Sequence, residues 1–201
     1  MMNARDDQRS ATAAPVSSAT PVATHPVLVV VHGLGEHSGR YRSVAERLSD
    51  LGWLTFAQDL PGHGSAAGRR GDVASYELLL DRIEGMWSEA ARIGKPCRLW
   101  GHSFGGNLVV NLLLRRGRLT ALQKALVTGP VFRTTHPAPL WKRAAARTLA
   151  GVWPTLTVGT GIDPRDLSRD ESEVDAYRTD AANHDRISAR LGRAMIDSGK
   201  W

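Results

Sequence analysis

One short segment of the sequence has the residue types and the spacing of a nucleophilic serine site. Gly101-His102-Ser103-Phe104-Gly105 matches the pattern G-x-S-x-G. The flanking glycines permit a sharp turn that exposes the serine hydroxyl, so Ser103 is predicted to attack an acyl carbonyl. A surface serine in a glycine turn is the alternative. The sequence favours the catalytic interpretation, because a strand pattern at 98–100 precedes the motif and a helical pattern at 105–116 follows it.

Attack by a serine places negative charge on the carbonyl oxygen, and backbone N–H groups can stabilise that charge. The first expected donor is the N–H of Phe104, directly after the nucleophile. The second is the N–H of Leu34, because the segment His32-Gly33-Leu34-Gly35 follows the first apolar run of the chain. The side chains of His32 and His102 are expected to pack within their loops and not to act as bases.

The segments around these motifs alternate between strand and helix patterns. Strands are expected at 27–31, 53–57, 98–100 and 125–127, and helices at 41–51, 79–90 and 105–116. This order predicts an α/β fold with a mostly parallel sheet and helices on both faces. In such sheets a ligand binds beyond the carboxyl ends of the strands, which is where both motifs lie.

Composition divides the chain into four regions. Residues 1–26 are rich in Ala, Thr, Ser and Pro, and we expect a disordered lead there. Residues 27–131 are the core that contains the nucleophile. From 132 to 190 the pattern becomes helical and loop-like, which predicts a helical cap inserted into the core, and residues 191–201 begin the return to the core.

The overall composition limits the partners. The formal net charge is +6, but the basic residues are scattered among acids and form no run interleaved with aromatics, so no nucleic acid is expected. The single cysteine, Cys97, excludes an intramolecular disulfide and is expected to be a buried filler; no metal or organic cofactor is implied. No stretch approaches the roughly 20 apolar residues of a membrane span, and the lead lacks the apolar region of a signal peptide. The expected location is therefore cytoplasmic, and the oligomeric state stays open.

Four motifs together resemble a known group of serine hydrolases. The segment from His32 to Tyr41 reads HGLGEHSGRY, and the segment from Asp59 to Gly64 reads DLPGHG. With the serine turn at 100–106 and the segment LSRDESEVDAYRTD at 167–180, they resemble the monoacylglycerol lipase and lysophospholipase group, whose domain is also serine aminopeptidase-like. The motifs occur in the order of that group, and the resemblance covers roughly residues 27 to 190.

The resemblance implies an α/β-hydrolase that cleaves carboxylic esters through an acyl-enzyme on Ser103. Its small-molecule substrates would be monoacylglycerols, lysophospholipids or similar acyl esters. It also implies a cap of apolar helices that forms a slot for an acyl chain, lined by Leu140, Trp141 and Trp153. Packing within a helical hairpin explains these three residues equally well.

The resemblance further places Gly33, Glu36 and Arg40 near the glycerol end of the pocket. A surface ion pair between Glu36 and Arg40 is an equal alternative. A cap that admits lipid esters also implies transient contact with a membrane or lipid interface.

The sequence departs from the pattern of the group at several points. A serine usually stands two residues beyond Gly64, whereas this chain has Ser65 followed by an alanine. The Asp-Pro-Leu at the end of the cap is replaced by Asp-Ala-Ala at 180–182. The first two strands of the usual fold are not visible before Val27.

The residues that would activate Ser103 are not recognisable in the sequence. The order in this fold is Ser, then Asp or Glu, then His, each on a loop after a later strand. After residue 130 the only histidines are His136 and His184, both in the cap region. Asp180 and His184 have the right order, but they stand at i,i+4 spacing without strands to aim them, and we interpret them as a solvated pair.

Two explanations of the missing triad residues remain. The favoured one is C-terminal truncation, so that the last strands are absent and the 201-residue chain is inactive by itself. A natural short form is the other, and it would expose a sheet edge. Three functions follow: a serine ester hydrolase, a non-catalytic form that binds a lipid or partner, and a hydrolase of the serine aminopeptidase kind.

Overall fold

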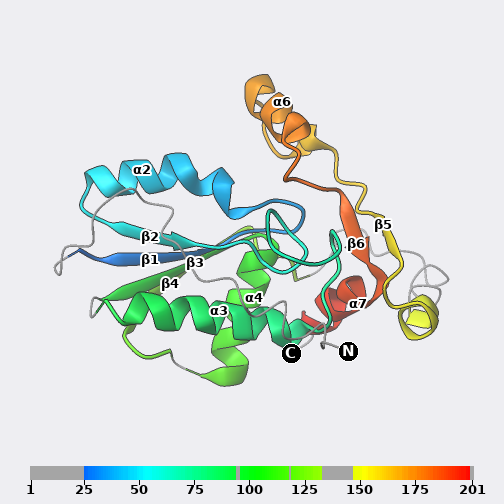
Figure 1. The fold of residues 1–201 in the computed structure, drawn as a ribbon, viewed down its shortest axis with the longest axis horizontal. Coiled ribbons are helices and arrows are strands. Elements are labelled where there is room, and N and C mark those ends of the chain that lie inside the picture. Colours follow the sequence, from blue (N-terminus) through cyan, green and yellow to red (C-terminus); the bar gives the residue numbers. More distant parts are fainter. Residues whose placement is uncertain (1–24, 94–95, 118, 133–146, 200–201) are drawn as a thin grey trace.

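A parallel sheet forms the centre of the structure, a computed structural model that describes residues 25–93, 96–117, 119–132 and 147–199 (Figure 1). The strand order in this sheet is β2-β1-β3-β4. The strands are β1 (Val27–Val31), β2 (Leu54–Ala57), β3 (Cys97–His102) and β4 (Leu122–Thr128). β1 pairs in parallel with β2 and β3, and β3 pairs in parallel with β4. The carboxyl ends of all four strands therefore meet at one edge.

Helices cover both faces of this sheet. They are η1 (Ser38–Tyr41), α2 (Arg42–Asp50), α3 (Tyr76–Ala91) and α4 (Phe104–Arg116). Val29 of β1 is buried in the main core with residues of α3 and α4, whereas its neighbour Val30 faces the other way and packs with Tyr41 and Ala57. Figure 1 shows α2 on one side of the sheet and α3 with α4 on the other. Successive side chains of a strand face opposite ways, so the continuous apolar run of β1 is buried on both faces.

The strands and helices predicted for the core are confirmed, with shifts at their ends. β3 extends beyond the predicted 98–100, and α4 begins at Phe104 instead of 105. β4 begins three residues before its predicted start because its register is set by pairing with β3, while its own residues 123 to 126 are exposed at the edge of the described sheet. Cys97 is buried at the start of β3, as expected for a small apolar filler.

Residues 132–190, predicted to be helical and loop-like, also contain strands in their described part. An antiparallel ribbon of β5 (Thr157–Gly159) and β6 (Arg186–Ser188) lies in this region, together with η2 (Pro164–Asp166) and α6 (Glu171–Thr179). Each strand has three residues, which is too short to show a two-residue period, and the partners lie far apart in sequence. α7 (Ala189–Ser198) follows β6 and contacts α3. In the described part of the chain, no helix has the length and apolar character needed to cross a membrane.

Candidate active site

Ser103 lies on the turn between β3 and α4, where it is the N-cap residue of the helix. Its backbone has φ 52° and ψ −115°, a region that residues other than glycine rarely occupy. Such a conformation persists only where the surrounding structure determines it, and a serine nucleophile at a strand-to-helix turn is a common case. The N–H of Ser103 donates to the carbonyl oxygen of Thr128 over 2.9 Å, which ties the turn to the end of β4.

Gly105, the second residue after the nucleophile, allows α4 to begin directly against β1. A Cβ atom at Gly105 would lie 2.1 Å from the carbonyl oxygen of Val31 and 2.5 Å from that of His32. This close approach brings the loop after β1 next to the nucleophile. A Cβ atom at Gly33 would lie 3.2 Å from Cβ of Ser103. The two sequence motifs therefore meet at the carboxyl ends of adjacent strands.

The two predicted oxyanion donors lie on the two sides of this junction. The N–H of Phe104 belongs to the first turn of α4, where N–H groups have no partner within the helix and the helix dipole favours negative charge. The Phe104 side chain is fully buried in the main core, which fixes the turn. Leu34 follows Gly33 in the loop that approaches Ser103. The roles of both N–H groups stay predictions.

The side chain of Glu36 lies in the loop after β1 and accepts hydrogen bonds that stabilise this loop. Its Oε1 accepts a hydrogen bond from the N–H of Gly33 over 2.6 Å and another from the hydroxyl of Tyr41 over 2.9 Å. The predicted ion pair with Arg40 is present, with 3.3 Å between Arg40 Nε and Glu36 Oε2, but the Glu36 side chain is only 13% exposed. The guanidinium of Arg40 also lies 4.8 Å from the ring centre of Tyr177 in the cap. Because the Gly33 N–H donates to Glu36, the Glu36 side chain stabilises the conformation of the loop in this structure. The substrate roles of Gly33, Glu36 and Arg40 stay predictions.

Asp59 connects the loop after β1 with the loop after β2. Its Oδ1 accepts hydrogen bonds from the N–H and the hydroxyl of Ser38, both at 2.8 Å. Its Oδ2 accepts from the N–H and the hydroxyl of Ser65, at 2.7 and 2.9 Å. Burial alone would raise the pKa of Asp59, but these four hydrogen bonds outweigh it and lower the pKa to about 2. The sequence identifies Asp59 only as the first residue of the DLPGHG motif, and no local pattern indicates its bonds to two distant serines.

Replacing Asp59 by asparagine is expected to lower the free energy of unfolding by about 1–2 kcal/mol at neutral pH. The reason is that the NH2 group of the amide would face the donors of Ser38 or Ser65 instead of accepting from them. The folded pKa of Asp59 lies below its unfolded value, so its stabilisation is complete above about pH 4 and is lost as the pH falls toward 2. Urea unfolding at about pH 7, 4 and 3 measures the difference between wild type and Asp59→Asn. Asp50→Asn, at the exposed end of α2, controls for loss of a charge. A difference that stays constant with pH would contradict the assignment.

Three histidine rings form a row behind the loop. His32 is buried, its Nε2 accepts from the N–H of Leu60 over 2.9 Å, and its ring centre lies 5.3 Å from that of His63. The ring centre of His63 lies 4.8 Å from that of His184 in the cap. Burial is the main cause that lowers the pKa of all three rings, that of His63 to about 3, so they are neutral at physiological pH. The expected packing role of His32 agrees with these contacts, while His102 is exposed and bonds to a hydroxyl of β4.

The interpretation of Asp180 and His184 as a solvated pair is wrong. Asp180 Oδ2 lies 2.8 Å from Nε2 of His37, and His184 packs on His63. The reason is that α6 ends at Thr179, so the two residues do not share a helix face. Within the described ranges, no histidine or carboxylate side chain is hydrogen bonded to the hydroxyl of Ser103.

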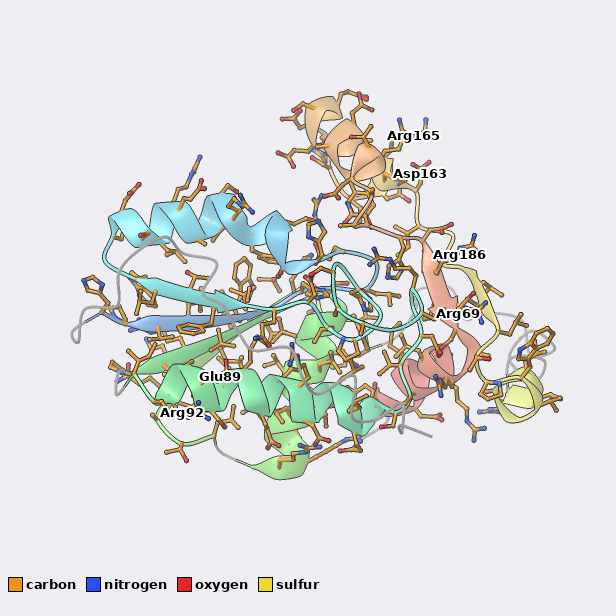
Figure 2. The ribbon with its side chains drawn as sticks, viewed as in Figure 1. Arg69, Glu89, Arg92, Asp163, Arg165 and Arg186 are labelled. Carbon is orange, nitrogen blue, oxygen red and sulfur yellow. The ribbon has the colours of Figure 1, made fainter. Side chains whose placement is uncertain are left out.

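Backbone hydrogen bonds and one ion pair fasten the end of the cap region to the core. The N–H of His184 donates to the carbonyl oxygen of Gly35 over 2.8 Å, so the cap contacts the loop that holds the predicted oxyanion donor. Arg190 donates from Nε and from a terminal nitrogen to the two oxygens of Asp72, over 2.7 and 2.6 Å. Arg69 reaches from the loop after β2 and donates to the carbonyl oxygen of Thr155 (Figure 2).

A cavity of about 330 Å³ opens between the cap and the loop after β1. Leu34 lines it from the core, and Thr160, Ile162, Tyr177 and Asn183 line it from the cap. The cavity therefore has both apolar and hydrogen-bonding groups beside the predicted oxyanion donor. Its position at the carboxyl ends of the strands agrees with the general rule for ligand sites in parallel sheets.

The cap residues predicted to line an acyl slot are only partly described. Leu140 and Trp141 lie outside the described residues. Trp153 is 57% exposed, so it does not line a closed slot within the described part of the chain. The acyl slot therefore stays a prediction.

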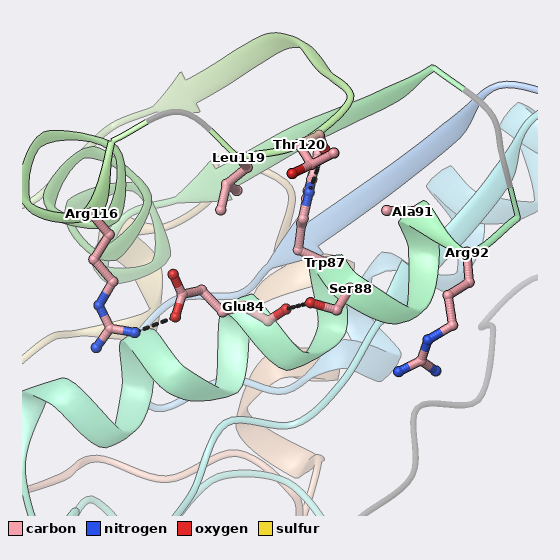
Figure 3. Close-up of a pocket in the computed structure, with 8 residues that line it drawn as sticks. All are labelled: Glu84, Trp87, Ser88, Ala91, Arg92, Arg116, Leu119 and Thr120. Carbon is pink, nitrogen blue, oxygen red and sulfur yellow. Dashed lines mark hydrogen bonds and ion pairs between the residues drawn. The ribbon is translucent and has the colours of Figure 1, made fainter.

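A second hollow lies far from this site, at the other end of the helices (Figure 3). It is lined by the carboxyl-terminal half of α3 and by Arg116 at the end of α4, about 20 Å along the helix from Ser103. Arg116 is paired with Glu84 there, and Trp87 Nε1 donates to the carbonyl oxygen of Thr120 over 2.9 Å. Nothing in its lining provides a nucleophile with a base. In the described residues, no group of three or more His, Cys, Asp or Glu side chains could hold a metal ion.

The parallel sheet and the sharp strand-to-helix turn at Ser103, with the loop after β1 against it, are the arrangement of the α/β-hydrolase fold. The model of the family described as serine aminopeptidase, S33, matches residues 23–201, and the chain belongs to that family. Among curated relatives, it is 36% identical to the human monoglyceride lipase over 166 residues, which cover 80% of this chain and 53% of that protein. It is 30% identical to a monoacylglycerol lipase of Mycolicibacterium smegmatis over 178 residues, covering 87% of this chain and 62% of that protein.

Solved structures of lipases from other organisms are also similar to this chain. The chain is similar to a crystal structure of monoacylglycerol lipase from Paleococcus ferrophilus, with a TM-score of 0.77, 35% identity, and coverage of 88% of this chain and 67% of that one. A soluble variant of the Saccharomyces cerevisiae monoglyceride lipase, in complex with a substrate analog, shares the fold, with a TM-score of 0.76, 23% identity, and coverage of 92% and 62%. The chain spans about half the length of the human relative.

Proposed function

We propose that the protein containing this chain is a serine hydrolase that cleaves monoacylglycerol-like carboxylic esters. The observation that carries the proposal is the position of Ser103, on a strained turn at the N-terminus of α4 and directly against the Gly33 loop. The similarity to monoacylglycerol and monoglyceride lipases supports the same class of substrate.

In the proposed reaction, the Oγ of Ser103 attacks the ester carbonyl carbon, and its proton passes to a general base. The N–H groups of Phe104 and Leu34 stabilise the oxyanion of the tetrahedral intermediate. The C–O bond to the alcohol then breaks, the base returns the proton to the leaving alkoxide, and water later releases the acid from Ser103. No histidine in the described ranges bonds to Ser103, so we propose that the base and its carboxylate lie outside these residues and that the 201-residue chain does not turn over alone.

The cavity between Leu34 and the cap supports a place for the alcohol part of the ester. The side chains of Tyr177, Asn183 and Asp180 on its cap side offer donors and acceptors for hydroxyl groups. A lysophospholipid carries a phosphate ester in place of one of the two free glycerol hydroxyls. An aminoacyl amide carries its ammonium group on the acyl part and has an amine as leaving group, so it offers no glycerol hydroxyls to this cavity. We therefore expect monoacylglycerols to be hydrolysed faster than either.

The proposal is tested in the full-length protein that carries this sequence. A fluorophosphonate probe is expected to label Ser103, and a long-chain 1-monoacylglycerol is expected to be cleaved at least about tenfold faster than a lysophospholipid or an aminoacyl amide. Hydrolysis of aminoacyl amides without ester cleavage would favour the aminopeptidase alternative. No labelling of a folded protein, together with saturable binding of fatty acid, would favour a binding role. Ser88→Ala, on α3, should leave labelling unchanged.

We also propose that the cap contacts lipid surfaces. Side chains of the cap region that are apolar and at least one-half exposed support this contact: Val152, Trp153, Val158, Ile162 and Leu167. Binding to phosphatidylcholine vesicles, measured by cosedimentation, is expected to fall at least about threefold in the double variant Val152→Ser, Trp153→Ser. Leu51→Ser is the matched control, because Leu51 is 74% exposed but follows α2 in the core. Equal loss in the variant and the control would contradict a role of the cap.

A further inference from the structure

A fully buried asparagine lies one helical turn after the nucleophile. Asn107 is on α4, has no exposed surface, and sits among apolar residues of the main core. Its side-chain Nδ2 donates to the carbonyl oxygen of Val131 over 2.9 Å. Its Oδ1 accepts from the hydroxyl of Tyr76 over 2.7 Å and from that of Ser198 over 3.1 Å. Both ends of the amide are therefore used.

The partner of Nδ2 contacts the nucleophile itself. The N–H of Val131 donates to the carbonyl oxygen of Ser103 over 3.2 Å, and the same oxygen accepts from the N–H of Asn107 over 3.1 Å. The side chain of Asn107 then holds the carbonyl of Val131, which closes a ring of three residues around the turn. With the bond from the Ser103 N–H to Thr128, the last residue of β4 and the segment after it hold both backbone groups of the nucleophile.

An asparagine, and not an apolar residue, occupies this buried position on α4. A buried amide is costly unless its polar atoms are bonded, and an apolar side chain of similar size would fill the same space without that cost. Asn111, one turn further along α4, is equally buried and donates to the carbonyl oxygens of Asn107 and Ser198. Its Oδ1 has no partner among the described residues, and it has no bond to the segment after β4. The two amides differ in their contact with the nucleophile turn and not in their burial.

We propose that Asn107 is a positioning residue for Ser103. By fixing Val131 it holds the strained backbone of Ser103 and the direction of the adjoining Phe104 N–H. Loss of the side chain leaves the nucleophile present but allows the turn to relax, and small displacements of reacting groups reduce the rate of the chemical step. This role rests on the proposed ester hydrolysis, and its structural part can be measured without it.

The first test compares Asn107→Ala with Asn111→Ala in the full-length protein. Both remove an equally buried amide from the same helix, so both are expected to lower the melting temperature. Only Asn107→Ala is expected to lower kcat for a monoacylglycerol, by about tenfold or more, with KM within about twofold of wild type. Equal kcat values in the two variants would overturn the proposal.

The second test is independent of activity. Hydrogen exchange of the Val131 amide is expected to be at least about tenfold faster in Asn107→Ala than in Asn111→Ala, because the ring of hydrogen bonds is opened. If wild type does not hydrolyse esters, the proposed function fails, and this exchange rate still decides whether Asn107 holds the turn. Similar exchange in both variants would overturn the proposal even if the enzyme is active.

A variant of the same shape separates the two ends of the amide. Asn107→Asp keeps an acceptor for Tyr76 and Ser198 but places a carboxylate oxygen against the carbonyl of Val131. At about pH 8 it is expected to lose kcat as Asn107→Ala does, while Tyr76→Phe, which leaves the bond to Val131 intact, retains kcat within about twofold. Wild-type kcat in Asn107→Asp at this pH, with the new carboxyl group shown by its infrared absorption to be ionised, would show that the bond to Val131 has no role.

Discussion

Replacing Ser103 by alanine is expected to reduce kcat for ester hydrolysis in the full-length protein by at least about 1,000-fold. The reason is that no acyl-enzyme can form without the nucleophile, and what remains is catalysis by the oxyanion donors and by binding alone. Steady-state hydrolysis of a monoacylglycerol and labelling by a fluorophosphonate measure the two consequences. Both signals should disappear together.

The melting temperature of Ser103→Ala should stay near that of wild type, because alanine must adopt the same φ of 52° that serine adopts. Ser103→Gly is expected to be inactive but more stable by up to about 1 kcal/mol, since glycine occupies positive φ without strain. This pair separates the chemical role of Ser103 from its backbone strain. Residual turnover above about one-hundredth of wild type in a folded Ser103→Ala variant would contradict its assignment as nucleophile.

Replacing Gly105 by alanine is expected to have the largest effect on stability, a loss of at least about 3 kcal/mol or failure to fold. The new Cβ would lie 2.1 Å from the carbonyl oxygen of Val31 and 2.5 Å from that of His32, and both are backbone atoms that cannot move without shifting β1. Any folded fraction should react slowly with a fluorophosphonate, because α4 must move away from the loop that contains Leu34. Urea unfolding and the rate of labelling measure the two effects.

Gly85→Ala is the matched control for this substitution. Gly85 also lies within a helix, but a Cβ atom there would meet nothing within 4 Å. The change is expected to stabilise the protein by up to about 1 kcal/mol, since alanine loses less backbone freedom on folding. If Gly105→Ala were tolerated as well as Gly85→Ala, the close contact between α4 and β1 would be contradicted.

The core was predictable because its signals are local and repeated. Burial on both faces of the sheet accounts for the continuous apolar run of β1, and burial on one face accounts for the helical spacing of apolar residues in α2 and α3. The glycine turn marks the point where β3 ends and α4 begins. The meeting of Ser103 with the Gly33 loop followed from the rule that ligand sites form at the carboxyl ends of parallel strands. The exact ends of β3 and β4 were not predictable, since pairing with a neighbour extends a strand beyond its apolar residues.

The rest of the site depends on contacts between distant segments, which leave no periodic signal. Asp180 was expected to face solvent, yet it meets His37, and His184 meets His63. The bonds of Asp59 to two serines also depend on how two loops approach each other. For Asn107 a signal did exist, namely an amide on the buried face of a helix, where asparagine is rarely placed without a bonding partner.

The attachments of the cap have a consequence for the order in which the protein folds. Asp72 and Arg190 are separated by 118 positions, and His37 and Asp180 by 143. Each of these contacts closes a long loop, and the conformational entropy of that loop is lost before the contact can stabilise the fold. We therefore expect the sheet, with the turn at Ser103 already formed, to precede the docking of α7 and β6. The cavity beside Leu34 is then completed in the last steps of folding, so a nascent form of the protein exposes its nucleophile before it has a place for the substrate.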